Sequence, residues 1–209
     1  MASNITWHSG QVTRTDRAEA RTAQGATLWL TGLSGSGKST LAAAVEHRLV
    51  SDGRAAYRLD GDNLRTGLNG DLGFSREARE ENCRRVAEVA RLFADAGLVA
   101  VVAIISPYAE SRLRAREIHE QVGLPFVEVY LDASAELCAS RDPKGLYAQA
   151  SAGNIDAFTG VDDPYEVPES PDLVVDSDIE VTDAVDLVMG ALKRKLETLS
   201  SAGDPETFG

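Results

Sequence analysis

One short segment combines glycine, lysine and hydroxyl side chains at a spacing that suits phosphate binding. The segment GLSGSGKS (32–39) fits the pattern GxxxxGK(S/T). Its glycines let consecutive backbone N–H groups converge on phosphate oxygens, where a Cβ atom would obstruct them. The residues concerned are Gly32, Leu33, Ser34, Gly35, Ser36, Gly37, Lys38, Ser39 and the adjoining Thr40. We therefore expect a nucleotide here, with Lys38 reaching the β- and γ-phosphates and Ser39 ligating Mg²⁺.

Two carboxylates follow a second apolar segment, 55–59. Asp60 and Asp62 belong to the run Asp60-Gly61-Asp62-Asn63. Ligands of an open α/β sheet lie beyond the carboxyl ends of its strands, so both carboxylates should face the phosphates. One of them would hold Mg²⁺ through water or accept a proton from an acceptor hydroxyl. The same composition also favours an Asx turn, and the sequence leaves both interpretations open.

Arginines gather after these carboxylates, at positions 65, 76, 79, 84 and 85. Guanidinium groups bind phosphate or sulfate in a bidentate way. Glutamates are interleaved with them, so surface ion pairs at i,i+4 spacing are the expectation for Arg76, Arg84 and Arg85. Anion binding is the stronger hypothesis for Arg65 and Arg79. A neighbouring aromatic residue, Phe74, either stacks on a base or packs in the core.

An alternation of apolar strands and amphipathic helices must position these side chains. The expected strands cover 26–31, 55–59, 98–105, 125–131 and 173–175, and the expected helices cover 38–52, 76–96, 109–122, a short stretch from 134, and 181–198. The run 98–105 is apolar throughout, which suits a strand buried on both faces of a parallel sheet. Strands that alternate with helices require crossovers, so the predicted fold class is α/β, a P-loop NTPase-type parallel sheet with helices on both faces.

Three segments fall outside this alternation. Residues 1–25 form a polar N-terminal arm, and residues 200–209 form a tail expected to be disordered. Residues 141–171 are rich in Gly, Pro, Asp and Tyr and show no sustained period. A stretch of this length without regular structure is usually functional, so we expect a lid or a binding loop there. The single domain then covers 26–199.

Composition excludes several classes of protein. The 209 residues are 43% hydrophobic and 26% charged, with a net charge of −12. Such a balance argues against general nucleic-acid binding, which needs a basic face, so any anionic ligand must be held by a local site. The run 98–105 is too short to span a bilayer, and the N-terminus has no apolar signal region. Cys83 and Cys138 have no metal-binding spacing and predict reduced core thiols in a cytoplasmic protein.

Several segments together resemble the adenylyl-sulfate (APS) kinase family. They are GLSGSGKST (32–40), LDGDNLRTGLN (59–69), DLGFSREAREEN (71–82), LFADAGL (92–98), IISPYAESR (104–112), RDPKGLY (141–147) and FTGVDDPYEVPESPDLVV (158–175). The similarity covers about residues 3–195. It implies transfer of the γ-phosphoryl group of ATP to the 3′-hydroxyl of adenosine 5′-phosphosulfate (APS), with Mg²⁺, to give PAPS and ADP.

The resemblance also implies roles for individual residues. ATP would be bound by 32–40 and Arg141, Mg²⁺ by Ser39 and Asp60, and catalysis would use Lys38, Asp60, Asp62 and Ser106. Substrate contacts would come from Asp62, Arg65, Phe74, Arg79, Asn82, Ile105, Ser106, Lys144 and Phe158, with Phe74 and Phe158 enclosing the adenine. The family describes Ser106 as a phosphoserine intermediate, although direct in-line transfer needs no covalent relay. Arg141, Asp142 and Lys144 would belong to the mobile lid.

Departures from the family pattern are concentrated in that lid. The family usually reads KARAGEIKGFTG where this chain reads QASAGNIDAFTG (149–160). Basic positions thereby become Gln149, Ser151 and Asp156, and Thr66 stands where many relatives have His. The P-loop, Asp60-Gly61-Asp62-Asn63, Arg79 and Asn82 are intact, which argues against a degenerate regulatory copy.

Two other functions stay open at the level of sequence. A P-loop kinase that acts on a different small hydroxyl compound would explain the altered lid. A kinase-like regulatory module attached to an ATP sulfurylase would bind nucleotide without forming ADP. For the leading hypothesis, the expected partners are APS, a second copy in a homodimer and, by association or fusion, an ATP sulfurylase; no nucleic acid and no membrane are expected.

Overall fold

The predicted parallel sheet is present in a computed structural model, which describes residues 11–21, 23–142, 145, 147, 159 and 163–201. Five strands lie in the order β2-β3-β1-β4-β5, and all four pairings are parallel. The strands are β1 (Ala26–Thr31), β2 (Ala56–Asp60), β3 (Val99–Ala103), β4 (Phe126–Asp132) and β5 (Leu173–Asp176). The α/β prediction is therefore confirmed, and its strand limits differ from the observed ones by at most two residues.

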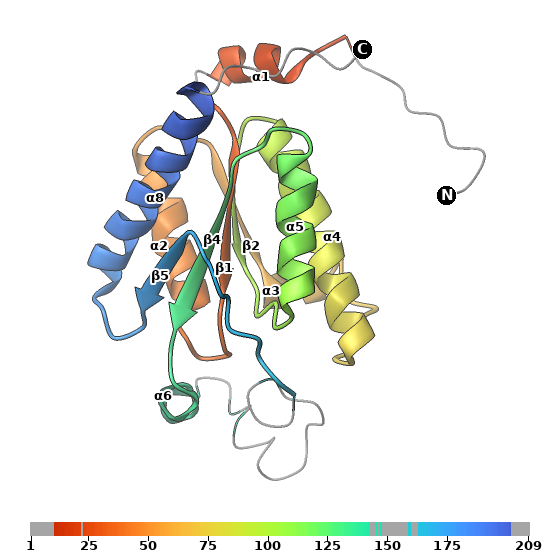
Figure 1. Cartoon of the computed structure of the whole chain (residues 1–209), viewed down its shortest axis with the longest axis vertical. Helices are drawn as coiled ribbons and strands as arrows, with labels where there is room; N and C mark the ends of the chain where they lie inside the picture. Colours follow the sequence, from red (N-terminus) through yellow and green to blue (C-terminus); the bar gives the residue numbers. More distant parts are fainter. Residues whose placement is uncertain are drawn as a thin grey trace, which may run out of the picture.

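Helices cover both faces of this sheet (Figure 1). On one face, α2 (Lys38–Ser51) and α8 (Val181–Ser201) share a hydrophobic cluster with the sheet. On the other face, α4 (Arg76–Asp95) and α5 (Ala109–Glu120) form a second cluster with it. The two short helices α3 (Gly61–Arg65) and α6 (Ala135–Arg141) follow the carboxyl ends of β2 and β4. The sheet is thus a buried middle layer, and its carboxyl edge carries the connections that build the site.

Alternation along the central strands divides the core between the two faces. In β1, Leu28 and Leu30 pack toward α2 and α8, whereas Trp29 packs toward α4 and α5. Every residue of β3 is buried, because the strand is covered on both faces. This confirms the interpretation of the apolar run 98–105. Both cysteines, Cys83 and Cys138, are free and buried, as expected.

Two helices appear where the sequence suggested only arm or turn. The helix α1 (Arg14–Arg21) lies at the end of the molecule opposite α6, where Arg14 and Arg17 both bind Asp95 of α4 (Figure 1). The helix α3 begins directly after Asp60, whose side chain accepts the backbone N–H of Asp62 at 3.1 Å. A capping carboxylate satisfies one of the unpaired N–H groups of a helix start, so the turn-forming composition here opens a helix.

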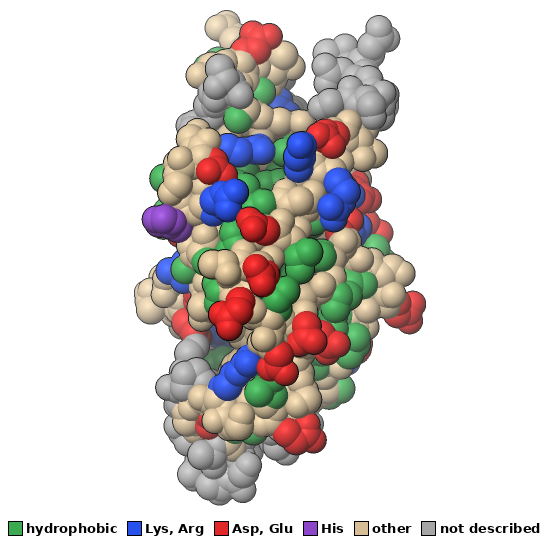
Figure 2. All heavy atoms as spheres, turned by 90° about the vertical axis from the view of Figure 1, so that its left-hand side faces the viewer, with side chains coloured by type: hydrophobic (Ala, Val, Ile, Leu, Met, Phe, Trp, Pro, Cys, Tyr) green, Lys and Arg blue, Asp and Glu red, His purple; other side chains and the backbone are tan. Residues whose placement is uncertain are grey.

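Surface charge is mixed rather than uniformly acidic. On the face formed by α2 and α8, acidic side chains lie mainly in the middle and toward the carboxyl edge, and basic ones gather toward the other end (Figure 2). Any anionic ligand at the carboxyl edge must therefore be held by particular groups rather than by the overall field. Within the residues that the structure describes, no helix is both long and apolar enough to cross a membrane.

Candidate active site

The loop between β1 and α2 has the conformation that the glycine spacing predicts. Gly35 and Gly37 have φ values of 82° and 95°, in the left-handed region that favours glycine. A Cβ on Gly35 would lie 2.8 Å from the carbonyl oxygen of Cys138, so α6 also requires glycine there. Gly37 is the N-cap of α2 and offers no side chain to its first-turn N–H groups. These N–H groups and the positive end of the helix dipole make an anion site.

Lys38 is folded back over this loop. Its Nζ donates to the carbonyl oxygens of Gly32 at 2.9 Å and Leu33 at 2.6 Å, and the side chain is buried. The hydroxyl residues that follow, Ser39 and Thr40, are exposed. Because these contacts are to neutral carbonyls, a phosphate oxygen within reach is a stronger partner for the ammonium group.

The two predicted carboxylates have different surroundings. Asp60 is buried, its Oδ1 accepts the N–H of Asp62, and Arg58 Nη1 donates to its Oδ2 at 3.4 Å. Asp62 is exposed in the first turn of α3. Both line the same cavity as Lys38 and Ser39. Asp60 is therefore held by its neighbours, and Asp62 is the more exposed of the two carboxylates.

One cavity of about 990 Å³ joins the phosphate loop to most of the predicted substrate residues. This volume is at the upper end of the range for small-molecule sites, roughly 300–1,000 Å³. The predicted residues that line it are Ser34, Gly35, Ser36, Gly37, Lys38, Ser39, Thr40, Asp60, Asp62, Arg65, Phe74, Arg79, Asn82, Ile105, Ser106 and Arg141. Two members of the motif, Gly32 and Leu33, do not line the cavity, and their carbonyl oxygens accept hydrogen bonds from Lys38.

A cationic and aromatic wall, made of Arg65, Phe74 and Arg79, lines the same cavity as the phosphate loop. Arg65 lies with its Cζ 4.3 Å from the centre of the Phe74 ring, and its Nη1 donates to Leu72 O at 2.9 Å. Arg79 is buried, and its Nε donates to Phe74 O at 2.9 Å. Burial and the nearby charge of Arg79 lower the pKa of Arg65. Two guanidinium groups beside an exposed aromatic ring suit an anionic nucleotide.

Ser106 lies at the base of this cavity in a chain of buried hydrogen bonds. Trp29 Nε1 donates to Ser106 Oγ at 3.1 Å, and Ser106 Oγ donates to Thr31 Oγ1 at 2.8 Å. Thr31 in turn donates to Ile105 O at 2.7 Å. Because an indole N–H only donates, these contacts commit the Ser106 hydroxyl proton to Thr31. Ser106 also has a positive φ of 41°.

Sequence reasoning missed a buried arginine that ties the site together. Arg112 Nε donates to Glu128 Oε1 at 2.9 Å, Nη1 to Ser106 O at 2.8 Å and Nη2 to Glu166 O at 2.6 Å. The sequence did contain a signal for such an arginine. Glu128 lies within an apolar strand, and a buried carboxylate needs a cationic or hydrogen-bonding partner. Asp163 is held in the same region, because the Tyr108 hydroxyl donates to its Oδ2 at 2.9 Å.

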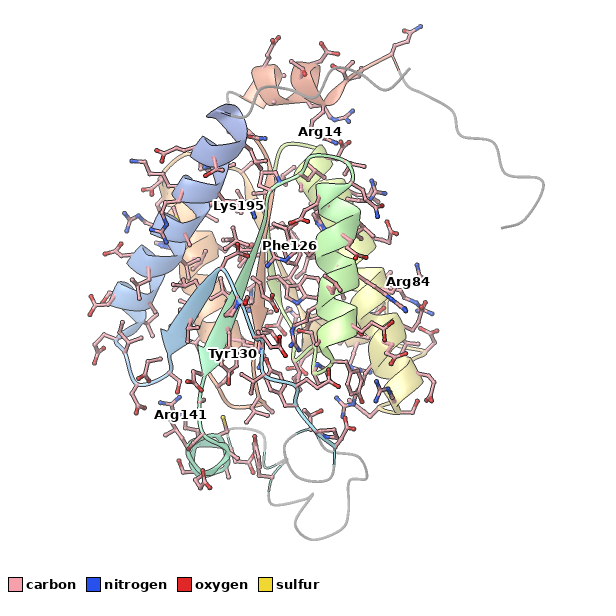
Figure 3. The ribbon with its side chains drawn as sticks, viewed as in Figure 1. Arg14, Arg84, Phe126, Tyr130, Arg141 and Lys195 are labelled. Carbon is pink, nitrogen blue, oxygen red and sulfur yellow. The ribbon has the colours of Figure 1, made fainter. Side chains whose placement is uncertain are left out.

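The segment after β5 also lines the cavity and was missed. Residues 176–181 lie at the carboxyl end of β5 and line the cavity. Ligands of an open α/β sheet lie beyond the carboxyl ends of its strands, so this segment could have been predicted in the same way as Asp60. Arg141 lies at this end of the molecule (Figure 3), where its Nη2 donates to Ser177 O at 3.0 Å. Lys144 and Phe158 lie outside the described residues, as do Gln149, Ser151 and Asp156.

The other arginines of the cluster at positions 65–85 form the surface pairs expected of them. Arg76 binds Glu80, Arg84 binds Glu81, and Arg85 binds both Glu81 and Asp71. Figure 3 shows Arg84 on the outer side of the helix, away from the sheet. That interpretation is confirmed, and only Arg65 and Arg79 of the cluster line the cavity.

The donor set around the loop suits a hard cation held jointly with phosphates. Within the described part of the chain, no three His, Cys, Asp or Glu side chains group as a metal site. Mg²⁺ commonly uses one or two protein oxygens, several waters and substrate phosphates, so it needs no such cage. The Ser39 hydroxyl and the Asp60 and Asp62 carboxylates line one cavity and fit this requirement.

Comparison with known proteins decides the family. A family model described as adenylylsulphate kinase matches residues 24–176, which include the phosphate loop, both carboxylates and the cationic wall. The chain belongs to the adenylylsulphate kinase family. Its relatives in this family include the adenylyl-sulfate kinase of Penicillium chrysogenum, 52% identical over 203 residues that span 93% of this chain and 96% of the relative. The adenylyl-sulfate kinase of Staphylococcus carnosus is 50% identical over 193 residues, or 92% and 96% of the two chains.

Solved structures agree with this assignment. The APS kinase CysC of Mycobacterium tuberculosis, in complex with AMPPNP and APS, is similar with a TM-score of 0.80 and 50% identity. The match covers 82% of this chain and 99% of that chain. The adenylylsulphate kinase fold therefore accounts for the parallel sheet, its helices and the placement of the phosphate loop, and the resemblance inferred from the sequence is confirmed.

Proposed function

We propose that this adenylyl-sulfate kinase transfers the γ-phosphoryl group of ATP to the 3′-hydroxyl of APS, giving PAPS and ADP. The observation that carries the proposal is a single cavity lined both by an anion-binding loop and by Arg65, Phe74 and Arg79. A nucleotide triphosphate and a sulfated nucleotide would both find cationic partners in it. Membership of the family supplies the identity of the acceptor.

On this proposal, the chain's own residues divide the work between binding and proton transfer. The amides of 32–40 bind the phosphates, and Lys38 leaves the carbonyls of Gly32 and Leu33 for the β- and γ-phosphates. Asp62 accepts the proton of the acceptor hydroxyl, because it is exposed and lines the cavity, whereas Asp60 is buried. Asp60 would contact the metal through water. Mg²⁺, when bound, neutralises charge on the β- and γ-phosphate oxygens.

Direct in-line transfer fits the surroundings of Ser106 better than a phosphoserine does. The Ser106 side chain is buried, and its hydroxyl both accepts from Trp29 and donates to Thr31. A phosphoryl group on this oxygen would break both hydrogen bonds and carry charge into the interior. Ser106 therefore shapes the wall of the acceptor site, while the phosphoryl group passes between the two nucleotides.

We further propose a cytoplasmic enzyme that uses ATP and Mg²⁺ and acts as a homodimer. The compartment is supported by the two cysteines, which are buried and form no disulfide with each other. Association with an ATP sulfurylase is part of this proposal, and its support is that such an enzyme would supply APS. Size-exclusion chromatography with light scattering tests the oligomeric state, and a twofold mass of the chain is the expected result.

A coupled ADP-release assay tests the function directly. Rates are compared with APS, adenosine, gluconate and shikimate as acceptors, and only APS is expected to support turnover above the background. Lys38→Ala should lower kcat by about 10²–10³, the usual cost of removing one donor from a developing charge. The matched control is Lys193→Ala, which removes an exposed lysine of α8 and should leave the rate unchanged. Equal rates without APS would reject the proposed acceptor.

A further inference from the structure

We propose that Asn69, to which neither the motifs nor the resemblance assign a role, is a positioning residue that sets the hydrogen-bonding polarity of the acceptor site. It would do so by orienting the carboxamide of Asn82, so that the amino group of Asn82 faces the substrate. The inference rests on the proposed function, because it takes APS as the ligand beside Asn82. It adds a residue outside the cavity wall to those that determine specificity.

The two asparagines meet behind the cationic wall. Asn69 lies between α3 and α4 and is fully buried, and Asn82 is buried on α4 one turn after Arg79. Asn69 Nδ2 donates to Asn82 Oδ1 at 2.9 Å. Asn82 lines the cavity, whereas Asn69 does not. Asn69 is therefore in contact with Asn82 from the side away from the ligand.

The direction of this hydrogen bond determines what Asn82 offers to a ligand. A carboxamide has one acceptor end and one donor end. Because the Oδ1 end of Asn82 is taken by Asn69, its Nδ2 end remains for the cavity. The opposite arrangement would present a carbonyl oxygen to the ligand. Phosphosulfate oxygens only accept hydrogen bonds, so the observed direction is the one that suits APS.

A second observation indicates that the important group of Asn69 is its side-chain donor, Nδ2. Its backbone N–H donates to Leu64 O at 2.9 Å, and its backbone carbonyl accepts from Leu72 N at 3.1 Å. The side-chain Oδ1, however, is buried without a hydrogen-bond partner among the described residues. An unsatisfied buried acceptor is unfavourable for stability, so it calls for a functional explanation. Orientation of Asn82 supplies that explanation.

The test compares Asn69→Leu with the wild-type chain. Leucine has nearly the shape of asparagine but cannot donate, so Asn82 is free to turn. We expect the KM for APS to rise about fivefold, a value within the range for one hydrogen bond, with the KM for ATP within about twofold. The thermal midpoint should stay level or rise, because the unsatisfied acceptor is removed. A purely structural role predicts the reverse pattern, a lower midpoint and no selective effect on APS.

The matched controls are Asn82→Leu and the double variant with both substitutions. If Asn69 acts only through Asn82, then Asn69→Leu should not raise the KM for APS any further once Asn82 is replaced. An unchanged KM for APS in folded Asn69→Leu overturns the proposal, and so does an equal rise in the Asn82→Leu background. Should Asn69→Leu fail to fold, Asn69→Asp replaces it. Aspartate keeps the shape and accepts only, so it should raise the KM for APS at least as much.

Failure of the proposed function can be distinguished from failure of the proposed role of Asn69. A wild-type chain that releases no ADP with APS rejects the assigned reaction, whatever the Asn69 variants do. APS binding measured by titration calorimetry then compares the same variants without turnover. Unchanged APS affinity in Asn69→Leu would overturn the role of Asn69 by itself.

Discussion

The hydroxyl of Tyr165 lies 2.9 Å from the hydroxyl of Thr31, across 134 residues of chain. Thr31 donates its own proton to Ile105 O, so Tyr165 is the donor in this contact. Thr31 directly precedes the phosphate loop, and Tyr165 follows Asp163, which Tyr108 holds near Arg79. This hydrogen bond therefore connects the two sides of the candidate site.

Replacing Tyr165 by Phe tests how much the hydrogen bond between Tyr165 and Thr31 contributes to the free energy of unfolding. Tyr165→Phe should lower the free energy of unfolding by about 1 kcal/mol, since it removes one buried hydrogen bond and leaves the ring in place. Tyr130→Phe is the control, because Tyr130 stacks on the same ring but donates only to Asp132 at 3.2 Å. Urea denaturation measures both, and an equal loss in the two variants would contradict the prediction.

Arg79→Ala should weaken APS much more than ATP. Arg79 is a buried residue of the acceptor wall, where its Nε also lies 3.8 Å from Asp163 Oδ2. A hydrogen bond to a charged group is worth about 1.5–3 kcal/mol, so the APS dissociation constant should rise about tenfold to a hundredfold. Titration calorimetry with each nucleotide gives the comparison. Arg84→Ala, on the outer side of the same helix, should change neither affinity.

Glu128→Gln should be among the most destabilising single changes in the chain. It leaves the buried Arg112 without its carboxylate partner, and breaking a buried pair from one side costs about 3–5 kcal/mol. Glu110→Gln breaks an exposed pair with Arg114 on the same helix and should cost about 0.5 kcal/mol or less. Both are measured by urea denaturation. Similar losses would mean that the Arg112 pair is no more important than a surface one.

His119 should make stability depend on pH. Its Nε2 lies 2.9 Å from Thr27 Oγ1 and its Nδ1 lies 2.7 Å from Ala115 O, and burial lowers its pKa to about 4. The unfolded chain binds this proton more readily, at a pKa near 6.5, so the contribution is complete above pH 6.5 and is lost as the pH falls toward 4. The loss amounts to about 3 kcal/mol.

Thermal or urea unfolding between pH 8 and pH 4.5 measures this effect. His119→Gln should flatten the slope relative to the wild-type chain, because glutamine does not titrate. His47→Gln removes an exposed histidine of α2 and should leave the slope unchanged. A wild-type slope that survives in His119→Gln would assign the pH dependence to other groups.

Some of the site could be predicted because its residues are close in sequence. The phosphate loop needs only glycine spacing, a preceding apolar run and a following helix, all of which lie within 26–51. The same holds for the surface pairs of Arg76, Arg84 and Arg85. Apart from the Asp71 contact, their partners are three or four positions away on the same helix. Elements with strong periodicity, such as 76–96, were placed to within a residue. The helices at 14–21 and 61–65 were missed because their sequences are polar and short.

By itself the sequence determined the fold class, the phosphate loop and the family, since each follows from local spacing or from contiguous motifs. Only the tertiary structure decided the strand order and the pairs Arg112–Glu128, Asn69–Asn82 and Thr31–Tyr165. The last two are hydrogen bonds between side chains from different elements, and Arg112–Glu128 is a buried ion pair. Their direction and strength depend on burial and on which atoms meet, and neither quantity is fixed until the sheet and its helices have packed together.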